Sequence, residues 1–217
     1  MIWTPETRAA RVDSILAQAP VLPVLAIERI EDAVPLARAL VDAGLPVLEI
    51  TLRTPAALDA MGAIVREVPG ACVGAGTVLR PEDLRNVEAA GAVFAIAPGT
   101  TPRLYEAAET TALAFIPAVA TASELMAGLE HGYRRFKFFP AESSGGVGAL
   151  RSFAGPFADV RFCPTGGIDA AKAPSYLALR NVATVGGSWM VPGDALAAGD
   201  FERIGALARE AAALRTR

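Results

Sequence analysis

Residues 47–77 read VLEITLRTPAALDAMGAIVREVPGACVGAGT, and their pattern decides the fold. Two apolar, β-rich runs at 47–52 and 71–77 enclose a helical stretch at 56–68, which Thr54-Pro55 opens and Pro69-Gly70 closes. A strand, a helix and a second strand in this order are typical of a βαβ unit with parallel strands.

The same alternation continues along the whole chain. The strand candidates are residues 21–27, 47–52, 71–77, 93–97, 113–118, 135–139, 160–164 and 183–187. Eight such units predict an α/β fold of the (β/α)8 TIM-barrel type, in a single domain over residues 1–217. An extra N-terminal helix at 5–18, within residues 1–19, is expected to cap the bottom of the barrel. An open doubly wound sheet is the alternative, but no Gly-rich dinucleotide fingerprint follows the first strand.

Several residues mark where helices should begin and end. Asp32 precedes a predicted helix at 33–43, and Gly44 follows it. Pro81 and Pro102 are expected to begin helices. Asp169 is expected to cap a short helix, and Asp200 to open the last one.

Composition narrows the possible partners. The formal net charge is −3 and the pI is near 5.3, so no basic field favours nucleic acid. The N-terminus has no signal-peptide pattern, and no apolar run approaches the ~18 residues that span a bilayer. We therefore expect a cytoplasmic protein with no membrane partner. Cys72 and Cys163 are expected to be reduced thiols, and a single histidine, His131, predicts no metal site.

Lys137 lies in the run Phe136-Lys137-Phe138-Phe139-Pro140, although it is one of only two lysines among 20 basic residues. Burial among phenylalanines disfavours the charged form of an amine, and only the neutral amine is a nucleophile. This position predicts that Lys137 forms an imine (Schiff base) with a carbonyl substrate. The alternative is a lysine whose stem packs on the aromatic rings while its ammonium reaches water.

The predicted strand at 47–52 supplies groups that could cooperate with Lys137. Strand alternation places Glu49, Thr51 and Arg53 on one face. A carboxyl group near an imine-forming lysine is an expected general acid and base, which makes Glu49 the candidate. Arg53 offers a fork of donors suited to a carboxylate. A buried ion-pair network with other strands is the structural alternative.

Glycine-rich turns follow three other strands. The sequence Gly74-Ala75-Gly76-Thr77 ends the third strand, where glycines permit close backbone approach and Thr77 brings a hydroxyl group. Gly166-Gly167 follows the seventh strand, and Gly186-Gly187-Ser188 ends the eighth. These last two positions are the usual phosphate site of such barrels, so we expect phosphate binding there. Lys172 is interpreted as a solvated surface charge.

These segments together resemble the class I 2-keto-3-deoxy-6-phosphogluconate (KDPG) aldolases, also called 4-hydroxy-2-oxoglutarate (KHG) aldolases. The resemblance runs from about residue 20 to the C-terminal helix. The segments that carry it are VLEITLRT at 47–54, VGAGTVL at 73–79, FKFFPAE at 136–142, RFCPTGGI at 161–168 and GGSW at 186–189.

The resemblance implies a homotrimeric barrel that cleaves KDPG into pyruvate and glyceraldehyde 3-phosphate through a lysine imine, with no metal or organic cofactor. It implies a small 2-oxo acid phosphate as substrate, and also cleavage of KHG to pyruvate and glyoxylate. The matching positions give Lys137 as the imine lysine and Glu49 as the proton carrier. The implied pyruvate site is Arg53, Thr77, Pro98, Phe139 and Thr165, and the implied phosphate site is Gly166, Gly167, Gly186, Gly187 and Ser188.

One position departs from the family pattern, because Ala118 stands where glycine is usual. Its methyl group could crowd the barrel mouth and change substrate breadth. Three alternatives stay open: a 2-keto-3-deoxy-6-phosphogalactonate aldolase, a phosphosugar isomerase or epimerase that uses carboxylates, and a non-catalytic phosphometabolite-binding barrel. A second carboxylate facing Glu49 would favour the isomerase.

Overall fold

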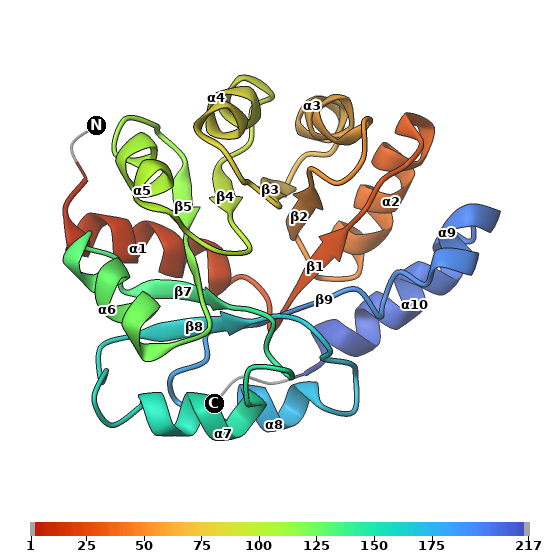
Figure 1. Ribbon diagram of the computed structural model, residues 1–217. Helices are drawn as coiled ribbons and strands as arrows, with labels where there is room; N and C mark the ends of the chain where they lie inside the picture. Colours follow the sequence, from red (N-terminus) through yellow and green to blue (C-terminus); the bar gives the residue numbers. More distant parts are fainter. Residues whose placement is uncertain (1–2, 215–217) are drawn as a thin grey trace.

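The computed structural model describes residues 3–214, in which helices and parallel strands alternate and the helices lie outside the strands (Figure 1). The strands are β1 (Val21–Leu25), β2 (Val47–Thr51), β3 (Cys72–Gly76), β4 (Phe94–Ile96), β5 (Ala114–Ile116), β6 (Ala118–Val119), β7 (Arg135–Phe138), β8 (Arg161–Pro164) and β9 (Val185–Gly187). The helices are α1 (Pro5–Leu16), α2 (Ile30–Asp42), α3 (Ala57–Glu67), α4 (Pro81–Ala89), α5 (Pro102–Ala108), α6 (Ala122–Glu130), α7 (Gly146–Phe153), α8 (Ala173–Leu177), α9 (Gly193–Ala198) and α10 (Phe201–Ala212). The predicted α/β class is confirmed.

The strands pair in two parallel groups that curl around an interior. Among the described residues the order is β5-β4-β3-β2-β1-β9 in one group and β6-β7-β8 in the other. Glu49 of β2 pairs with Gly74 of β3, and Lys137 of β7 pairs with Ala118 of β6 and Cys163 of β8. Both strands that were expected to carry chemistry are therefore held between two neighbours.

The predicted fifth strand, residues 113–118, is divided in the structure. Its first part is β5, which pairs with β4, and its second part is β6, which pairs with β7. Pro117 separates them, because it has no N–H group to continue a ladder. The Pro117 carbonyl still accepts a hydrogen bond of 2.9 Å from the Lys137 backbone amide. The fifth segment thus serves both groups of strands.

Alternating side chains divide the core into two clusters. Leu48 and Ile50 of β2 belong to the larger cluster, which packs the strands against the helices. Val47 of the same strand belongs to a smaller cluster with Phe94 and Cys163 from other strands. Glu49 follows Val47 at the strand period of two, so it projects to the same side as this inner cluster. The predicted alternation is confirmed for Val47, Leu48 and Ile50, whereas Arg53 lies beyond the end of β2.

Helix α1 packs against the inner cluster through Val12, Ile15 and Leu16. Its buried Arg8 donates hydrogen bonds to the Tyr133 hydroxyl (2.6 Å) and to Glu109 (2.8 Å). These contacts fix α1 to residues more than a hundred positions away along the chain.

The predicted limits of the helices are correct at some ends and wrong at others. Pro81 and Pro102 begin α4 and α5, and Asp200 caps α10 by accepting from the Arg203 amide. The predicted start of the second helix is wrong, because α2 already begins at Ile30. Asp32 lies in its first turn and accepts two 2.8 Å hydrogen bonds from the Arg29 guanidinium instead of capping the helix.

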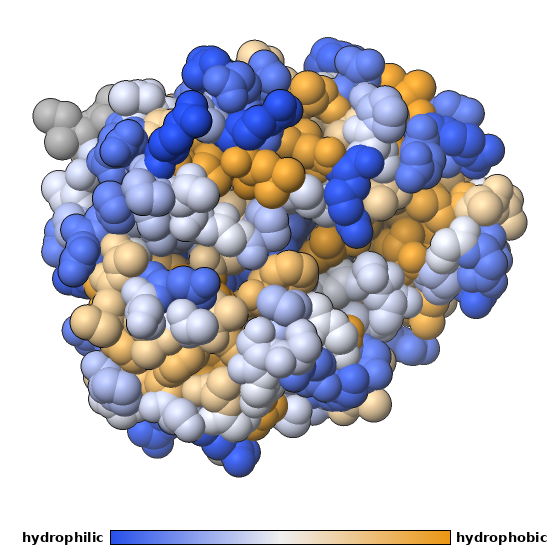
Figure 2. Space-filling model, viewed as in Figure 1, coloured by the Kyte–Doolittle hydropathy of each residue, from blue (hydrophilic) through white to orange (hydrophobic). Residues whose placement is uncertain are grey.

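On the face drawn in Figure 2, hydrophilic residues gather around the rim and hydrophobic residues lie between them. Within residues 3–214, no helix is both long and apolar enough to cross a membrane.

Candidate active site

Lys137 and Glu49 meet in the interior, although they are 88 residues apart in sequence. The Lys137 Nζ atom lies 2.9 Å from the Glu49 Oε1 atom. Lys137 is 5% exposed and Glu49 is 1% exposed. The strands that carry them belong to different groups, so the contact spans the space between the groups. The sequence prediction that these residues cooperate is consistent with this geometry.

The second carboxylate oxygen of Glu49 is left open. Glu49 Oε2 is buried and has no hydrogen-bond partner among the described residues. A buried carboxylate oxygen without a donor is costly to leave unsatisfied. Because a substrate hydroxyl could donate to it, this oxygen is suited to accept a proton from a bound molecule.

Gly76 makes room for the Glu49 carboxylate. A Cβ atom at Gly76 would stand 2.1 Å from Glu49 Oε1, whereas one at Gly74 would stand 2.3 Å from the Phe94 ring. Glycine is therefore required at these two positions of the third strand for different reasons. Gly74 permits core packing, and Gly76 permits the carboxylate to reach Lys137.

Gly76→Ala should displace Glu49 and lower turnover by at least about 10-fold, together with an overpacking cost of about 1–3 kcal/mol. The measurements are kcat and the thermal midpoint. Gly148→Ala is the matched control, because a Cβ there meets nothing within 4 Å and Gly148 lies inside α7. That variant should keep full turnover and gain slightly in stability. Equal behaviour of the two variants would contradict the proposed role of Gly76.

Arg53 is exposed at the end of β2 and is held by its neighbour on the same face. Its Nε atom donates to the Thr51 hydroxyl at 3.0 Å, and Thr51 donates to the Leu25 carbonyl at 2.8 Å. Arg53 and Ser188 also line the same cavity of about 210 Å³. Thr51 therefore acts as a support for Arg53, a role that the sequence did not reveal.

Three other predicted pyruvate-site residues follow strands. Thr77 directly follows β3 and has a φ angle of 62°, which is rare for a β-branched residue. Such strain occurs mainly at functional positions. The Phe139 ring centre lies 5.5 Å from Lys137 Nζ. Pro98 is half-buried shortly after β4.

Thr165 is buried at the end of β8, where its hydroxyl lies 3.4 Å from the Cys163 carbonyl. Close packing explains why residues without a side chain, Gly186 and Gly187, stand at these two positions. An added Cβ would stand 2.2 Å from Thr165 Oγ1 at Gly186, and 2.0 Å from the Trp189 ring at Gly187. Gly186 also forms a bridge with Thr165, so the ends of β8 and β9 are joined at this point.

Gly166 and Gly167 form a turn with left-handed backbone angles, with φ of 107° and 75°. Only glycine adopts such angles readily. Ser188 is exposed directly after β9. The Thr165–Gly186 bridge brings these two predicted phosphate segments to the same side of the strands.

Ala118 lies beside Lys137. It is 3% exposed, and its amide donates to the Thr100 hydroxyl at 3.1 Å. Neighbours in register on parallel strands project to the same face. The methyl group of Ala118 therefore lies on the Lys137 side of the strands, where the departure from the family pattern was expected to matter.

Two features near the site were not identified from the sequence. Cys163 pairs with Lys137 in register and is fully buried, and burial raises its thiol pKa to about 12. Both Cys163 and Cys72 are free thiols, as predicted. Lys172 is exposed at the surface as predicted, but its ammonium is not simply solvated, because it donates to the Gly167 carbonyl at 2.7 Å and lies 3.1 Å from Glu142.

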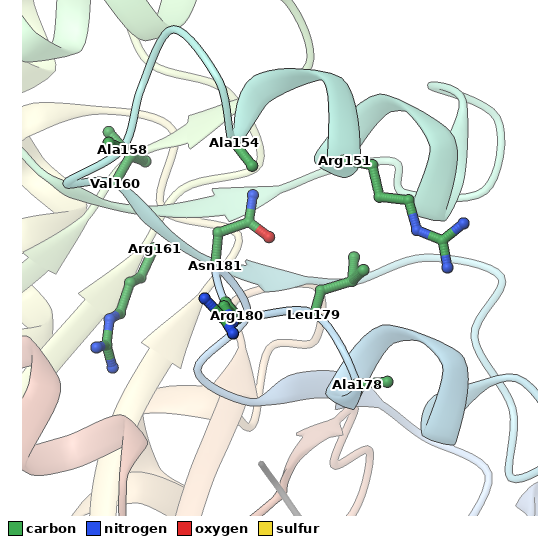
Figure 3. A pocket seen from close by; sticks show the side chains of 9 residues that line it. All are labelled: Arg151, Ala154, Ala158, Val160, Arg161, Ala178, Leu179, Arg180 and Asn181. Carbon is green, nitrogen blue, oxygen red and sulfur yellow. The ribbon is translucent and has the colours of Figure 1, made fainter.

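A cavity of about 630 Å³ lies elsewhere on the molecule, near the start of β8 (Figure 3). Its lining includes Arg151, Arg161 and Arg180, and none of the predicted site residues. In Figure 3 the Arg151 side chain points away from the other two arginines. Within the described part of the chain, no group of three His, Cys, Asp or Glu residues could hold a metal ion.

A buried amine beside a carboxylate, enclosed by parallel strands, is the arrangement expected of an enzyme that forms imines with carbonyl substrates. The family model described as KDPG and KHG aldolase matches residues 12–207. The KHG/KDPG aldolase of Escherichia coli strain K12 is 57% identical over 199 residues, which cover 92% of this chain and 93% of that protein.

Solved structures agree with this match. A KDPG aldolase from Legionella pneumophila, with pyruvate captured at low pH as a covalent carbinolamine intermediate, has a TM-score of 0.91 and 46% identity over 93% of this chain and 98% of that one. The KDPG aldolase of Zymomonas mobilis with 3-phosphoglycerate has a TM-score of 0.89 and 51% identity over 94% and 96%. The chain belongs to the KDPG and KHG aldolase family.

Proposed function

We propose that this protein is a class I aldolase that cleaves KDPG to pyruvate and glyceraldehyde 3-phosphate, and KHG to pyruvate and glyoxylate. The aldolase class follows from the family to which the chain belongs. The observation that carries the mechanism is the buried 2.9 Å contact between Lys137 and Glu49. An amine and a proton acceptor are the two groups that imine formation requires.

The first half of the reaction forms the imine. Glu49 accepts a proton from the Lys137 ammonium, and the neutral Nζ attacks the C2 carbonyl of the 2-oxo acid. The resulting carbinolamine loses water after its hydroxyl group is protonated, which leaves a protonated imine. Glu49 moves these protons, and its burial beside Lys137 supports this assignment.

The second half breaks the bond between C3 and C4. A base removes the proton of the C4 hydroxyl, the C4 oxygen becomes the aldehyde oxygen, and the bonding electrons move through C3 and C2 to the imine nitrogen. The enamine that remains takes a proton at C3, and water then releases pyruvate from Lys137. Glu49 Oε2, which has no donor in the described structure, is suited to accept the hydroxyl proton.

Other residues would hold the two ends of the substrate. Arg53 and Thr77 bind the pyruvate carboxylate, and Pro98, Phe139 and Thr165 line the pyruvyl pocket. Arginine suits this task because its fork of donors matches a carboxylate. The phosphate lies against the Gly166-Gly167 turn, with Gly186, Gly187 and Ser188 on its other side. The positive φ angles of the turn support this placement.

We also infer that the two strand groups make one closed (β/α)8 barrel in a single domain, with α1 covering one end. The fifth segment serves both groups, and bridges at Phe162–Val182 and Thr165–Gly186 join β8 to the segment of β9. The homotrimer and the cytoplasmic location that the resemblance and composition imply belong to the same proposal. The steps assigned to Lys137 and Glu49 need no metal or organic cofactor.

The isomerase and binding-protein alternatives are less well supported. An isomerase was expected to place a second carboxylate opposite Glu49, but the group there is Lys137. A binding protein would not need a buried amine in contact with a carboxylate. The Escherichia coli relative is named a KHG/KDPG aldolase, which supports the gluconate-type substrate over the galactonate type.

Borohydride reduction in the presence of pyruvate tests the imine. The mass of the peptide that contains Lys137 should increase by the reduced pyruvyl group. Lys172 is the only other lysine and serves as an internal control that should stay unmodified. Modification of Lys172 alone, or of neither lysine, would contradict the proposed mechanism.

A further inference from the structure

Lys172, Glu142 and Tyr176 form a polar cluster beneath the Gly166-Gly167 turn. The Lys172 Nζ atom donates to the Gly167 carbonyl at 2.7 Å and lies 3.1 Å from Glu142 Oε2. The Tyr176 hydroxyl donates to Glu142 Oε1 through a short hydrogen bond. Lys172 is thus half-exposed along its side chain but bonded at its charged end.

The cluster completes a set of hydrogen bonds that fixes the turn from one side. The Thr165 carbonyl accepts from the Ala141 amide at 2.8 Å, and the Gly166 carbonyl accepts from the Glu142 amide at 3.1 Å. Lys172 supplies the third bond, to Gly167. Three consecutive carbonyl groups are therefore occupied by donors of the protein itself.

The Gly167 amide group of the turn remains available. Within residues 3–214, the Gly167 N–H group donates to no protein acceptor. Amide groups in a positive-φ turn form a concavity that binds anions. Lys172 holds the Gly167 carbonyl, so it restricts rotation of the peptide group between Gly167 and Ile168.

The negative charge of Glu142 gives Lys172 a second, electrostatic role at the turn. A Cβ at Gly167 would stand 2.8 Å from Glu142 Cγ, so the glutamate packs directly against the turn. The Tyr176 hydroxyl bond, followed by the Lys172 ammonium, lowers the Glu142 pKa below its ordinary value. Glu142 is therefore a carboxylate at neutral pH, and without Lys172 its charge would repel a phosphate bound at the turn.

We propose that Lys172 is a positioning residue for the phosphate end of the substrate. It holds the Gly166-Gly167 turn in its anion-binding shape and neutralises Glu142 beside it. This inference rests on the proposed function, which places the substrate phosphate at this turn. Lys172 does not touch the reacting carbon atoms, so it should affect binding of phosphorylated substrates and leave the chemistry of Lys137 unchanged.

Lys172→Ala should raise the KM for KDPG by about 5- to 20-fold. This is the effect expected from the loss of one charge-assisted hydrogen bond, reduced because the lysine side chain is half-exposed. The kcat for KDPG, and both constants for unphosphorylated KHG, should change less than about twofold. Lys172→Arg should restore the KM, since arginine can bond both groups. In Lys172→Ala/Glu142→Gln, removal of the repelling charge should recover part of the loss.

Two further measurements separate the possible failures. Ser188→Ala should give the same substrate split, because Ser188 belongs to the proposed phosphate site itself. Arg85→Ala removes an exposed 3.4 Å ion pair on α4 and is the control for loss of a surface charge. Calorimetric titration with glycerol 3-phosphate measures the binding of a phosphate ester without turnover, and Lys172→Ala should weaken it by the same factor.

The inference is overturned if Lys172→Ala leaves the KM for KDPG and glycerol 3-phosphate binding unchanged while Ser188→Ala weakens both. It is also overturned if Lys172→Ala raises the KM for KDPG and for KHG equally, which indicates a general structural role. Wild-type protein that binds glycerol 3-phosphate but cleaves no KDPG contradicts the proposed function, and the titration still tests Lys172. Absence of binding by the wild type contradicts both.

Discussion

Lys137→Ala should lower kcat/KM for KDPG by at least about 10⁴-fold and abolish borohydride-dependent modification by pyruvate. The loss corresponds to about 5.5 kcal/mol of transition-state stabilisation, at 1.36 kcal/mol for each factor of ten. The reason is chemical, because the only other lysine in the chain is Lys172, whose ammonium bonds the Gly167 carbonyl. Within residues 3–214, no second lysine lies beside Glu49 to form the imine.

Truncation of Lys137 also leaves Glu49 buried without its ionic partner. Removal of one member of a buried ion pair costs about 3–5 kcal/mol in stability, so inactivity of the alanine variant could reflect unfolding. Lys137→Arg is the matched control, since arginine keeps the positive charge next to Glu49 but cannot form an imine. A folded Lys137→Arg protein that still cleaves KDPG would contradict the assignment of Lys137.

The sequence predicted that Lys137 and Glu49 would lie close together, because local rules determine the side to which each residue projects. Strand alternation puts Glu49 on the same side of β2 as Val47. In the same way, it puts the Lys137 side chain on the face of its strand opposite the two neighbouring phenylalanines. Parallel strands of an α/β fold then direct both side chains to one interior. The position of each residue thus followed from its own strand, and their contact followed from the fold class.

The environment of Lys172 could not be predicted in this way. It depends on the left-handed angles of Gly166 and Gly167, which turn the Gly167 carbonyl toward a helix that follows. A lysine among alanines in a helix-like segment carries no local signal of that contact. Helix α7 was likewise not predicted, because its first residues, Gly146-Val147-Gly148, are poor helix formers whose packing decides their structure.

The division of the fifth strand also could not be predicted from the sequence. Pro117 was visible in the sequence, but its effect depends on which neighbour each half can reach. The first half pairs with β4 and the second with β7, so one continuous apolar run contributes to two groups of strands. Hydrophobic pattern predicts that a strand exists there, whereas pairing is decided by partners that lie far apart in the sequence.

Glu49→Gln should lower kcat for KDPG by about 10²- to 10⁴-fold, which is the usual contribution of a positioned general acid and base. Glutamine has the shape of glutamate, so its carbonyl oxygen can keep the contact with Lys137 Nζ that measures 2.9 Å in the structure. What it loses is the ability to take up and release protons. Each proton-transfer step should therefore slow, and the retained hydrogen bond should reduce the stability cost of losing the ion pair.

Exchange of the pyruvate methyl protons in deuterium oxide isolates this role. Exchange requires the enzyme to form the enamine and to reprotonate C3, but it needs no carbon–carbon cleavage, and proton NMR measures it directly. Glu49→Gln should slow the exchange by a factor similar to its loss of kcat. Glu49→Asp is the matched control, since it keeps a carboxylate on a shorter side chain. It should retain more of the exchange rate and of kcat than Glu49→Gln does. If the Glu49→Gln variant and the wild-type protein exchange the methyl protons at equal rates, Glu49 only positions Lys137, and another group carries the proton to C3.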